Sequence, residues 1–196
     1  MIFCRLDLYF FPILDIYTPI DRTILGYKEL FSPIRRFSMK KAAVIHDLSG
    51  FGKCSLTAAI PVLSALGVQC CPVATAVLTG QTGYPCYHCT DLTAMLPDYI
   101  DAWGKNNAHF DAIYSGFLTG AEQISQVLDF IRQFREEHTL LLVDPVMGDD
   151  GNAYPFFTPG LLNGMKELTL EADVITPNLT EACLLADIPE DALLHC

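Results

Sequence analysis

Basic side chains and long apolar runs are both scarce in this sequence. Only 12 Lys and Arg residues stand against 23 Asp and Glu residues, which gives a formal net charge of −11. Because binding to nucleic acid depends on many basic groups that neutralise phosphates, this balance argues against nucleic acid as the main partner. No run of about 18 or more apolar residues occurs, although 51% of the chain is hydrophobic. The composition therefore argues against a membrane protein and indicates a globular domain with a sizeable core.

The first segment is not expected to act as a secretory signal, because Asp7, Pro12 and Asp15 interrupt any apolar stretch within it. The eight Cys residues are therefore expected as free thiols in a reducing cytoplasm. Cys86 and Cys89 have the spacing of a zinc site, but no second Cys-x-x-Cys motif or His pair accompanies them. Free thiols are the favoured interpretation of this pair.

Charge is distributed unevenly along the chain. Residues 1–38 carry five basic and four acidic side chains, a net of +1, whereas residues 39–196 carry seven basic and nineteen acidic ones, a net of −12. Met39, Lys40 and Lys41 then precede the first regular apolar segment. We therefore expect residues 1–38 to be an extension outside the core and the domain to begin near Met39.

From Lys41 onward, strand-like and helix-like segments alternate. Short apolar segments predict strands at residues 42–46, 68–77, 111–115, 140–143 and 173–176. Apolar residues at three- and four-residue steps predict helices at 54–66, 91–103, 121–134, 159–168 and 180–186. Pro61 is expected to kink the first helix or to delay its start. This alternation predicts an α/β fold in which helices cover both faces of a mostly parallel sheet.

Polar side chains follow each expected strand end. They are Asp47 to Ser55 after the first strand, Thr75 and Thr79 to Tyr84 at the second, residues 115–120 at the third, Asp144 and Asp149 at the fourth, and Asn178 with Glu181 at the fifth. Since the carboxyl ends of parallel strands lie along one edge of a sheet, these groups can line one cleft. An Asp placed there can hold a cation and the phosphate oxygens that accompany it. Each segment alone is equally typical of a solvated turn.

The turn that contains Gly52-Lys53-Cys54-Ser55 is not a P-loop. That motif requires a Gly where Asp47 stands and a hydroxyl side chain where Cys54 stands. The glycines of the present turn still allow the backbone to approach a ligand, and the start of the following helix favours a nearby anion.

Taken together, these motifs resemble the pyridoxal kinases of the ribokinase-like superfamily. The matching segments occur in family order across residues 39–186: Asp47 to Ser55, Thr75 to Tyr84, Ser115 to Leu118, Asp144 to Asp149 and Thr176 to Glu181. Hydroxymethylpyrimidine kinases share the Asp-Pro-Val-Met-Gly and Pro-Asn-x-x-Glu motifs and are the nearest rival. The segment from Thr79 to Tyr84 favours the pyridoxal kinases.

The resemblance implies a three-layer α/β/α sandwich, usually a homodimer, that transfers the γ-phosphate of ATP to the 5′-hydroxyl of pyridoxal, pyridoxine or pyridoxamine. It places Asp47 on the pyridine-ring side of the substrate, where many relatives have Ser. Thr75 would lie beside the ring, and Tyr84 would approach from a flap. Phe117 stands where many relatives have Tyr, so a stacking contact would persist without the hydroxyl.

The resemblance also assigns an acidic group to the nucleotide side. Asp144, Asp149, Asn178 and Glu181 would bind the ATP phosphates, and the three carboxylates among them would hold Mg²⁺ and its waters. Such an assignment agrees with the chemistry, because phosphoryl transfer depends mainly on positioning and on neutralising oxygen charge.

One family segment has no counterpart in these 196 residues. The family's Gly-Thr-Gly-Asp segment supplies an anion hole and the general base, and no Gly-x-Gly-Asp occurs here. The sequence thus resembles the N-terminal portion of such a kinase. General-base help is commonly worth about 10²–10⁴-fold in rate, so we expect little activity from this polypeptide alone. A non-catalytic, vitamin-binding half-domain is the alternative interpretation.

Overall fold

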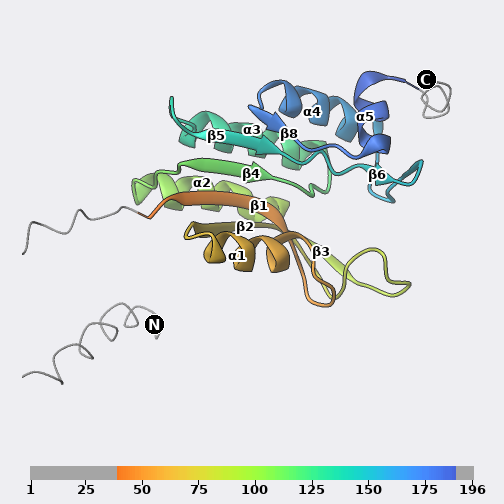
Figure 1. Cartoon of the computed structure of the whole chain (residues 1–196), viewed down its shortest axis with the longest axis horizontal. Coiled ribbons are helices and arrows are strands. Elements are labelled where there is room, and N and C mark those ends of the chain that lie inside the picture. The colour runs from red at the N-terminus through yellow and green to blue at the C-terminus, as the bar shows by residue number, and fades with distance from the viewer. Residues whose placement is uncertain (1–38, 189–196) are drawn as a thin grey trace, which may run out of the picture. The chain divides into compact units, whose positions relative to one another are not determined.

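The computed structural model describes residues 39–188 (Figure 1). The predicted extension, residues 1–38, lies outside this range. One sheet has the strand order β3-β2-β1-β4-β5-β8, and a separate hairpin consists of β6 and β7. The strands are β1 (Lys41–Ser49), β2 (Gln69–Leu78), β3 (Cys89–Asp91), β4 (Ala112–Ser115), β5 (Leu140–Val143), β6 (Gly148–Asp149), β7 (Asn152–Ala153) and β8 (Val174–Ile175). In the larger sheet, only β3 runs antiparallel to its neighbour, so the sheet is mostly parallel.

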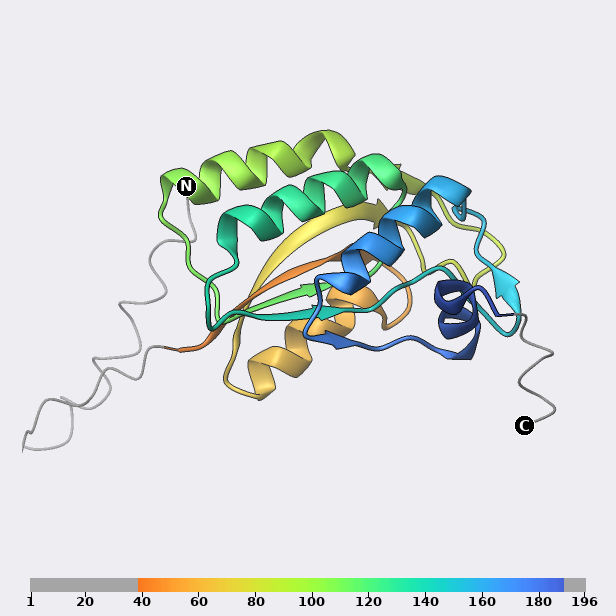
Figure 2. The ribbon, with the colours of Figure 1, turned by 90° about the horizontal axis from the view of Figure 1, so that it is seen from above.

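Helices lie on both faces of this sheet, as Figure 2 shows. The helices are α1 (Ser55–Ala65), α2 (Leu96–Lys105), α3 (Ala121–Phe134), α4 (Pro159–Leu170) and α5 (Leu179–Ala186). α1 covers one face, α2, α3 and α4 cover the other, and α5 packs beside β6. The predicted three-layer α/β/α architecture is confirmed. Among the described residues, no helix has the length and apolarity needed to cross a membrane.

Strand β1 lies at the centre of the sheet and is buried from both sides. Ala43 and Ile45 join the apolar cluster beneath α3, whereas Ala42 and Val44 pack on the α1 side with Leu56. This two-sided burial explains why the sequence shows a continuous apolar run at β1 instead of alternation. The polar residues begin where this run ends, at the edge of the sheet.

The structure differs from the sequence prediction at three places. The helix expected over residues 91–103 begins at Leu96, because Cys89–Asp91 pair with β2 and Thr93–Met95 form a 3₁₀ turn. Helix α1 begins at Ser55 and contains Pro61, so of the two expected effects of this proline the delayed start does not occur. The acidic loop after β5 folds as the β6–β7 hairpin. Its two turn residues, Asp150 and Gly151, have φ angles of 49° and 75°, and positive φ at both positions is the signature of a type I′ turn.

Candidate active site

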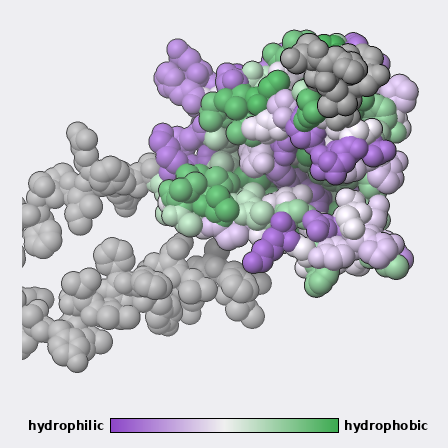
Figure 3. All heavy atoms as spheres, turned by 45° about the vertical axis from the view of Figure 1, so that its right-hand side comes forward, coloured by the Kyte–Doolittle hydropathy of each residue, from purple (hydrophilic) through white to green (hydrophobic). Residues whose placement is uncertain are grey.

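A cavity of about 510 Å³ lies at the carboxyl ends of the parallel strands. β1 pairs with β2 on one side and with β4 on the other, so the chain order reverses at β1, where ligands commonly bind in open α/β sheets. The lining side chains are His46, Asp47, Ser49, Cys54, Ser55, Ala58, Ala59, Val62, Leu63, Leu78, Gln81, Thr82, Tyr114, Phe117, Asp144, Val146, Tyr154 and Phe156. Figure 3 turns this end of the sheet forward and shows hydrophilic residues beside two hydrophobic areas.

Asp47 reaches the cavity from the end of β1. The register between β1 and β2 shifts between His46 and Leu48, and such irregularities often redirect a side chain next to a site. The Asp47 carboxylate is only 4% exposed and accepts a hydrogen bond from the Ser49 hydroxyl at 2.8 Å. The structure therefore brings a buried acceptor to the cavity wall at a predicted position.

A hydrogen bond links Thr75 to Phe117, but only Phe117 lines the cavity. The buried Thr75 hydroxyl donates to the Phe117 carbonyl oxygen at 2.9 Å, and the Gln123 amide donates to the Thr75 carbonyl oxygen at 2.9 Å. The Phe117 ring meets the Phe156 ring edge to face, with centroids 5.6 Å apart. In this structure Thr75 thus supports the aromatic wall from behind.

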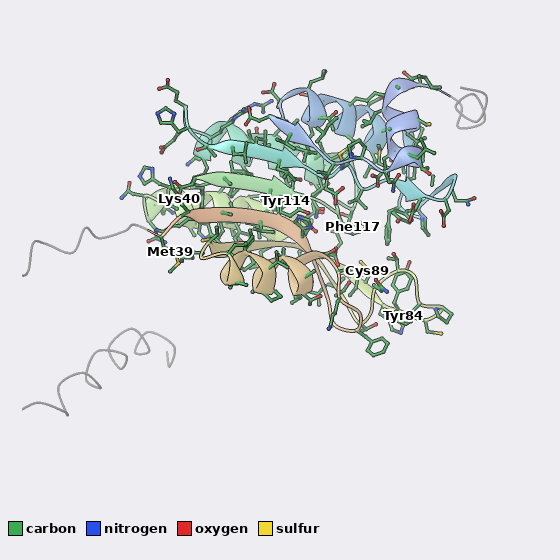
Figure 4. The ribbon with its side chains drawn as sticks, in the orientation of Figure 1. Met39, Lys40, Tyr84, Cys89, Tyr114 and Phe117 are labelled. Carbon is green, nitrogen blue, oxygen red and sulfur yellow. The ribbon has the colours of Figure 1, made fainter. Side chains whose placement is uncertain are left out.

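Tyr84 lies on the loop between β2 and β3, away from Phe117 (Figure 4). Its ring packs against Phe51, with centroids 4.8 Å apart, and 36% of its surface is exposed. The Gln81 backbone N–H donates to the Phe51 carbonyl oxygen at 2.9 Å, which ties this loop to the turn after β1. The loop reaches the cavity through Gln81 and Thr82, while Tyr84 lies outside the lining set.

Two predicted carboxylates lie in low-polarity surroundings. Burial raises the pKa of Asp144, and a hydrogen bond from Thr176 partly opposes that rise. Burial also raises the pKa of Glu181, hydrogen bonds from the backbone of Asn178 and Met147 lower it, and the charges of Asp144 and Asp149 raise it further. The carboxylates of Asp144 and Asp149 are thus close enough to Glu181 to repel its charged form.

Asn178 connects α5 to the β6–β7 hairpin. Its side-chain amide donates to the Gly148 carbonyl oxygen at 2.8 Å and to Asp149 Oδ1 at 3.4 Å. Glu181 is 4% exposed, and its Oε1 accepts from the Met147 amide at 3.2 Å. The structure therefore places Asn178 and Glu181 where they also hold the hairpin in place.

A ready-made metal centre is not found among residues 39–188, where no group of three or more His, Cys, Asp or Glu side chains is placed to hold an ion. Asp144, Asp149 and Glu181 offer only oxygen donors, and within residues 39–188 none of them forms an ion pair with a Lys, Arg or His side chain. Mg²⁺ keeps several waters and takes one or two carboxylates plus substrate phosphates, so these residues fit a water-mediated Mg²⁺ site. Cys86 and Cys89 are free thiols in the structure.

Sequence reasoning did not select His46, Tyr154 or Phe156 as site residues, although all three line the cavity. His46 directly precedes Asp47 at the end of a buried strand, and that position was a usable signal. Tyr154 and Phe156 follow β7, so their placement depends on the hairpin. The Asp150-Gly151 pair, a strong hairpin signal, could have revealed it.

The fold and this cleft define a ribokinase-like α/β protein. The sequence profile of the phosphomethylpyrimidine kinase family matches residues 52–193, and the chain belongs to this family. A pyridoxine/pyridoxal/pyridoxamine kinase of Bordetella avium is 35% identical over 143 residues, which cover 69% of this chain and 47% of the relative. A pyridoxal kinase of Pasteurella multocida is 37% identical over 82 residues, covering 40% of this chain and 28% of the relative.

Solved structures agree with this assignment. A Bacteroides thetaiotaomicron protein, provisionally described as a phosphomethylpyrimidine kinase and crystallised with pyridoxal, is 46% identical, with a TM-score of 0.76 over 80% of this chain and 56% of that chain. Pyridoxal kinase from Lactobacillus plantarum is 35% identical, with a TM-score of 0.72 over 78% of this chain and 54% of that chain. The chain therefore spans about half the length of these solved relatives.

Proposed function

We propose that this chain forms the substrate side and the metal side of a pyridoxal kinase, which transfers the γ-phosphate of ATP to the 5′-hydroxyl of pyridoxal, pyridoxine or pyridoxamine. The cavity at the carboxyl ends of β1, β4 and β5 is the observation that carries this proposal. Its wall combines a buried acceptor, Asp47, an aromatic surface, Phe117, and a half-buried carboxylate, Asp144. A polar heteroaromatic ring fits such a wall.

Each side chain has a separate task in the proposed reaction. Asp47 orients the ring through a hydrogen bond, and Phe117 packs against it, held in position by Thr75. Tyr84 and its loop cover the substrate from outside. These contacts fix the 5′-hydroxyl relative to the nucleotide, which is where much of the rate gain in phosphoryl transfer arises.

The acidic group serves the phosphates. Asp144, Asp149 and Glu181 would hold Mg²⁺ through its waters, and Asn178 would orient the ATP phosphates beside them. When bound, Mg²⁺ neutralises the charge that develops on the transferred phosphoryl oxygens. Burial raises the pKa of Asp144 and of Glu181, so their charged forms lack stabilisation that a bound cation would supply.

Hydroxymethylpyrimidine phosphorylation is the second candidate, and the family profile favours it. The proposed enzyme is cytoplasmic and homodimeric, and the free thiols of Cys54, Cys70, Cys71 and Cys183 agree with a reducing compartment. Since no Gly-x-Gly-Asp occurs in the 196 residues, we expect the polypeptide by itself to bind vitamers but to turn them over slowly at best.

Calorimetry of the full chain with pyridoxal, and separately with Mg-ATP, tests the proposal when it is combined with a phosphorylation assay on the same sample. We expect pyridoxal binding that Asp47→Asn weakens and that the control Asp129→Asn, on the exposed surface of α3, leaves unchanged. Tighter binding of 4-amino-5-hydroxymethyl-2-methylpyrimidine would favour the second candidate. No binding of any of these heterocycles would refute both candidates, and rapid turnover would refute the expected low activity.

A further inference from the structure

His46 is a buried cavity residue that the proposed function does not yet use. It is 4% exposed and lies on the α1 side of β1, directly before Asp47. The edge of its ring packs against Tyr114 on β4, with centroids 4.3 Å apart and planes at 71°. The imidazole is therefore held by neighbouring strands at the point where the cavity begins.

The chain makes room for this ring at Gly116. A Cβ atom added at Gly116 would overlap His46 Cε1 and Nδ1, at separations that real Cβ atoms essentially never show. Any larger residue at position 116 would push the imidazole out of its present position. His46 and Gly116 thus form one fitted pair at the ends of β1 and β4.

The His46 ring has an unsatisfied hydrogen-bonding atom. Its Nε2 is buried and has no hydrogen-bond partner among the described residues. Leaving a buried polar atom unpaired is unfavourable, so such an atom in a cavity wall calls for a ligand or a water. Burial also lowers the pKa of His46 to about 4, which keeps the imidazole neutral at physiological pH.

The chemistry of the wall indicates which ligand group His46 meets. Within the described chain no Lys or Arg lines the cavity, and His46 itself is uncharged, so this part of the wall does not attract a phosphate. Apolar side chains of α1, including Ala58 and Leu63, lie on the same cavity wall. A flat heterocycle with a polar ring substituent satisfies both the apolar surface and the unpaired nitrogen.

We propose that His46 is a substrate-positioning residue whose imidazole nitrogen hydrogen-bonds a polar substituent of the heterocyclic substrate. The inference rests on the proposed function, because it assigns His46 to the substrate end of the same cavity. A neutral imidazole carries one donor and one acceptor, so it can meet a hydroxyl, a carbonyl or an amine of the ring. His46 then selects the orientation of the ring, while Asp47 anchors it.

Calorimetric titration of the full chain with pyridoxal tests this assignment in two His46 variants. His46→Leu removes the hydrogen bond at similar volume and should weaken pyridoxal binding about tenfold, the effect of losing one such bond. His46→Gln keeps a donor and an acceptor and should recover most of that loss. Affinity for Mg-ATP should stay the same in both, which a merely unfolded variant would not show.

Gly116→Ala provides an independent test through the backbone. The new methyl group displaces the imidazole, so pyridoxal binding should fall as it does in His46→Leu. Gly160→Ala is the matched control, because its added Cβ would lie 3.4 Å from Ala121 Cβ and Gly160 is not among the residues that line the cavity. Pyridoxal binding within twofold of the original chain in His46→Leu would overturn the role of His46 alone. Failure of the original chain to bind any heterocycle would instead overturn the proposed function and, with it, this inference.

Discussion

Asn178 and Glu181 cap each other at the start of α5. Asn178 Oδ1 accepts from the Glu181 backbone N–H at 2.9 Å, and Glu181 Oε2 accepts from the Asn178 backbone N–H at 2.9 Å. This reciprocal capping box satisfies two backbone donors that the first turn of a helix leaves free. Both side chains are also proposed to serve the ATP phosphates, so stability and phosphate binding depend on the same pair.

Asn178→Ala should therefore destabilise the protein even without nucleotide. Loss of an N-cap acceptor costs about 0.5–2 kcal/mol, and the Gly148 carbonyl oxygen loses its donor as well. The measurement is the free energy of unfolding from urea denaturation. Asn178→Ser is the matched control, because it keeps a neutral capping oxygen, adds no charge beside Asp149 and should lose less. Equal losses in the two variants would contradict the role of the cap.

Thr75→Val should loosen the aromatic wall of the cavity. The variant keeps the size of the side chain but leaves the buried Phe117 carbonyl oxygen without its hydroxyl donor, a loss of about 1–3 kcal/mol. Thermal melts should show the loss for Val and near-original stability for Thr75→Ser, which retains the hydroxyl. A fully stable Val variant would show that Thr75 does not hold Phe117 in position.

The fold was largely predictable because its central segments carry strong periodic signals. Helix α3 was predicted at residues 121–134, and the structure has Ala121–Phe134, since apolar side chains at helical spacing face a single core cluster. β3 was missed because Cys89–Asp91 is only three residues long and pairs antiparallel with β2, a contact that no local pattern indicates.

The site was less predictable than the fold. Strand order alone implies that Asp47, Phe117 and Asp144 share one edge, and the structure brings them to one cavity. The separation of Tyr84 from the cavity depends on its packing against Phe51, which is a tertiary contact. The importance of His46 depends on a space left at position 116, which sequence periodicity does not report.

The stability of the protein should fall as the pH is lowered from about 6.5 to about 4, in part because of His46. Its pKa is about 4 in the folded chain, against 6.5 for a histidine that is not buried. Between these two values the unfolded chain binds a proton at His46 and the folded chain does not. Linkage then lowers the free energy of unfolding by about 3 kcal/mol, and this loss is complete once the pH lies below both pKa values. Urea denaturation at a series of pH values measures it.

His46→Gln isolates this contribution from other titrating groups. Asp144 and Glu181 have raised pKa values, so protonation favours their folded state and they act in the opposite direction as the pH falls. The difference in unfolding free energy between the variant and the original chain should shift in favour of the variant on acidification. Parallel curves would mean that His46 does not stay neutral in the fold.

Mg²⁺ should stabilise the protein, and Asp144 should be required for the effect. A ligand present at 100 times its dissociation constant and bound only to the folded state adds about 2.7 kcal/mol. Asp144→Asn removes a half-buried charge, so the metal-free variant should melt at the same temperature as the original chain or higher. In MgCl₂ the original chain should gain stability and the variant should not.

Two controls make the Mg²⁺ measurement specific. NaCl at equal ionic strength separates ion binding from general screening of the acidic chain, whose formal net charge is −11. Asp129→Asn removes an exposed carboxylate that pairs with Arg132 at 2.7 Å on α3, so it should retain the Mg²⁺ effect. If Asp144→Asn also retains the full effect, the ion binds elsewhere, and the proposed neutralisation of the acidic group is wrong.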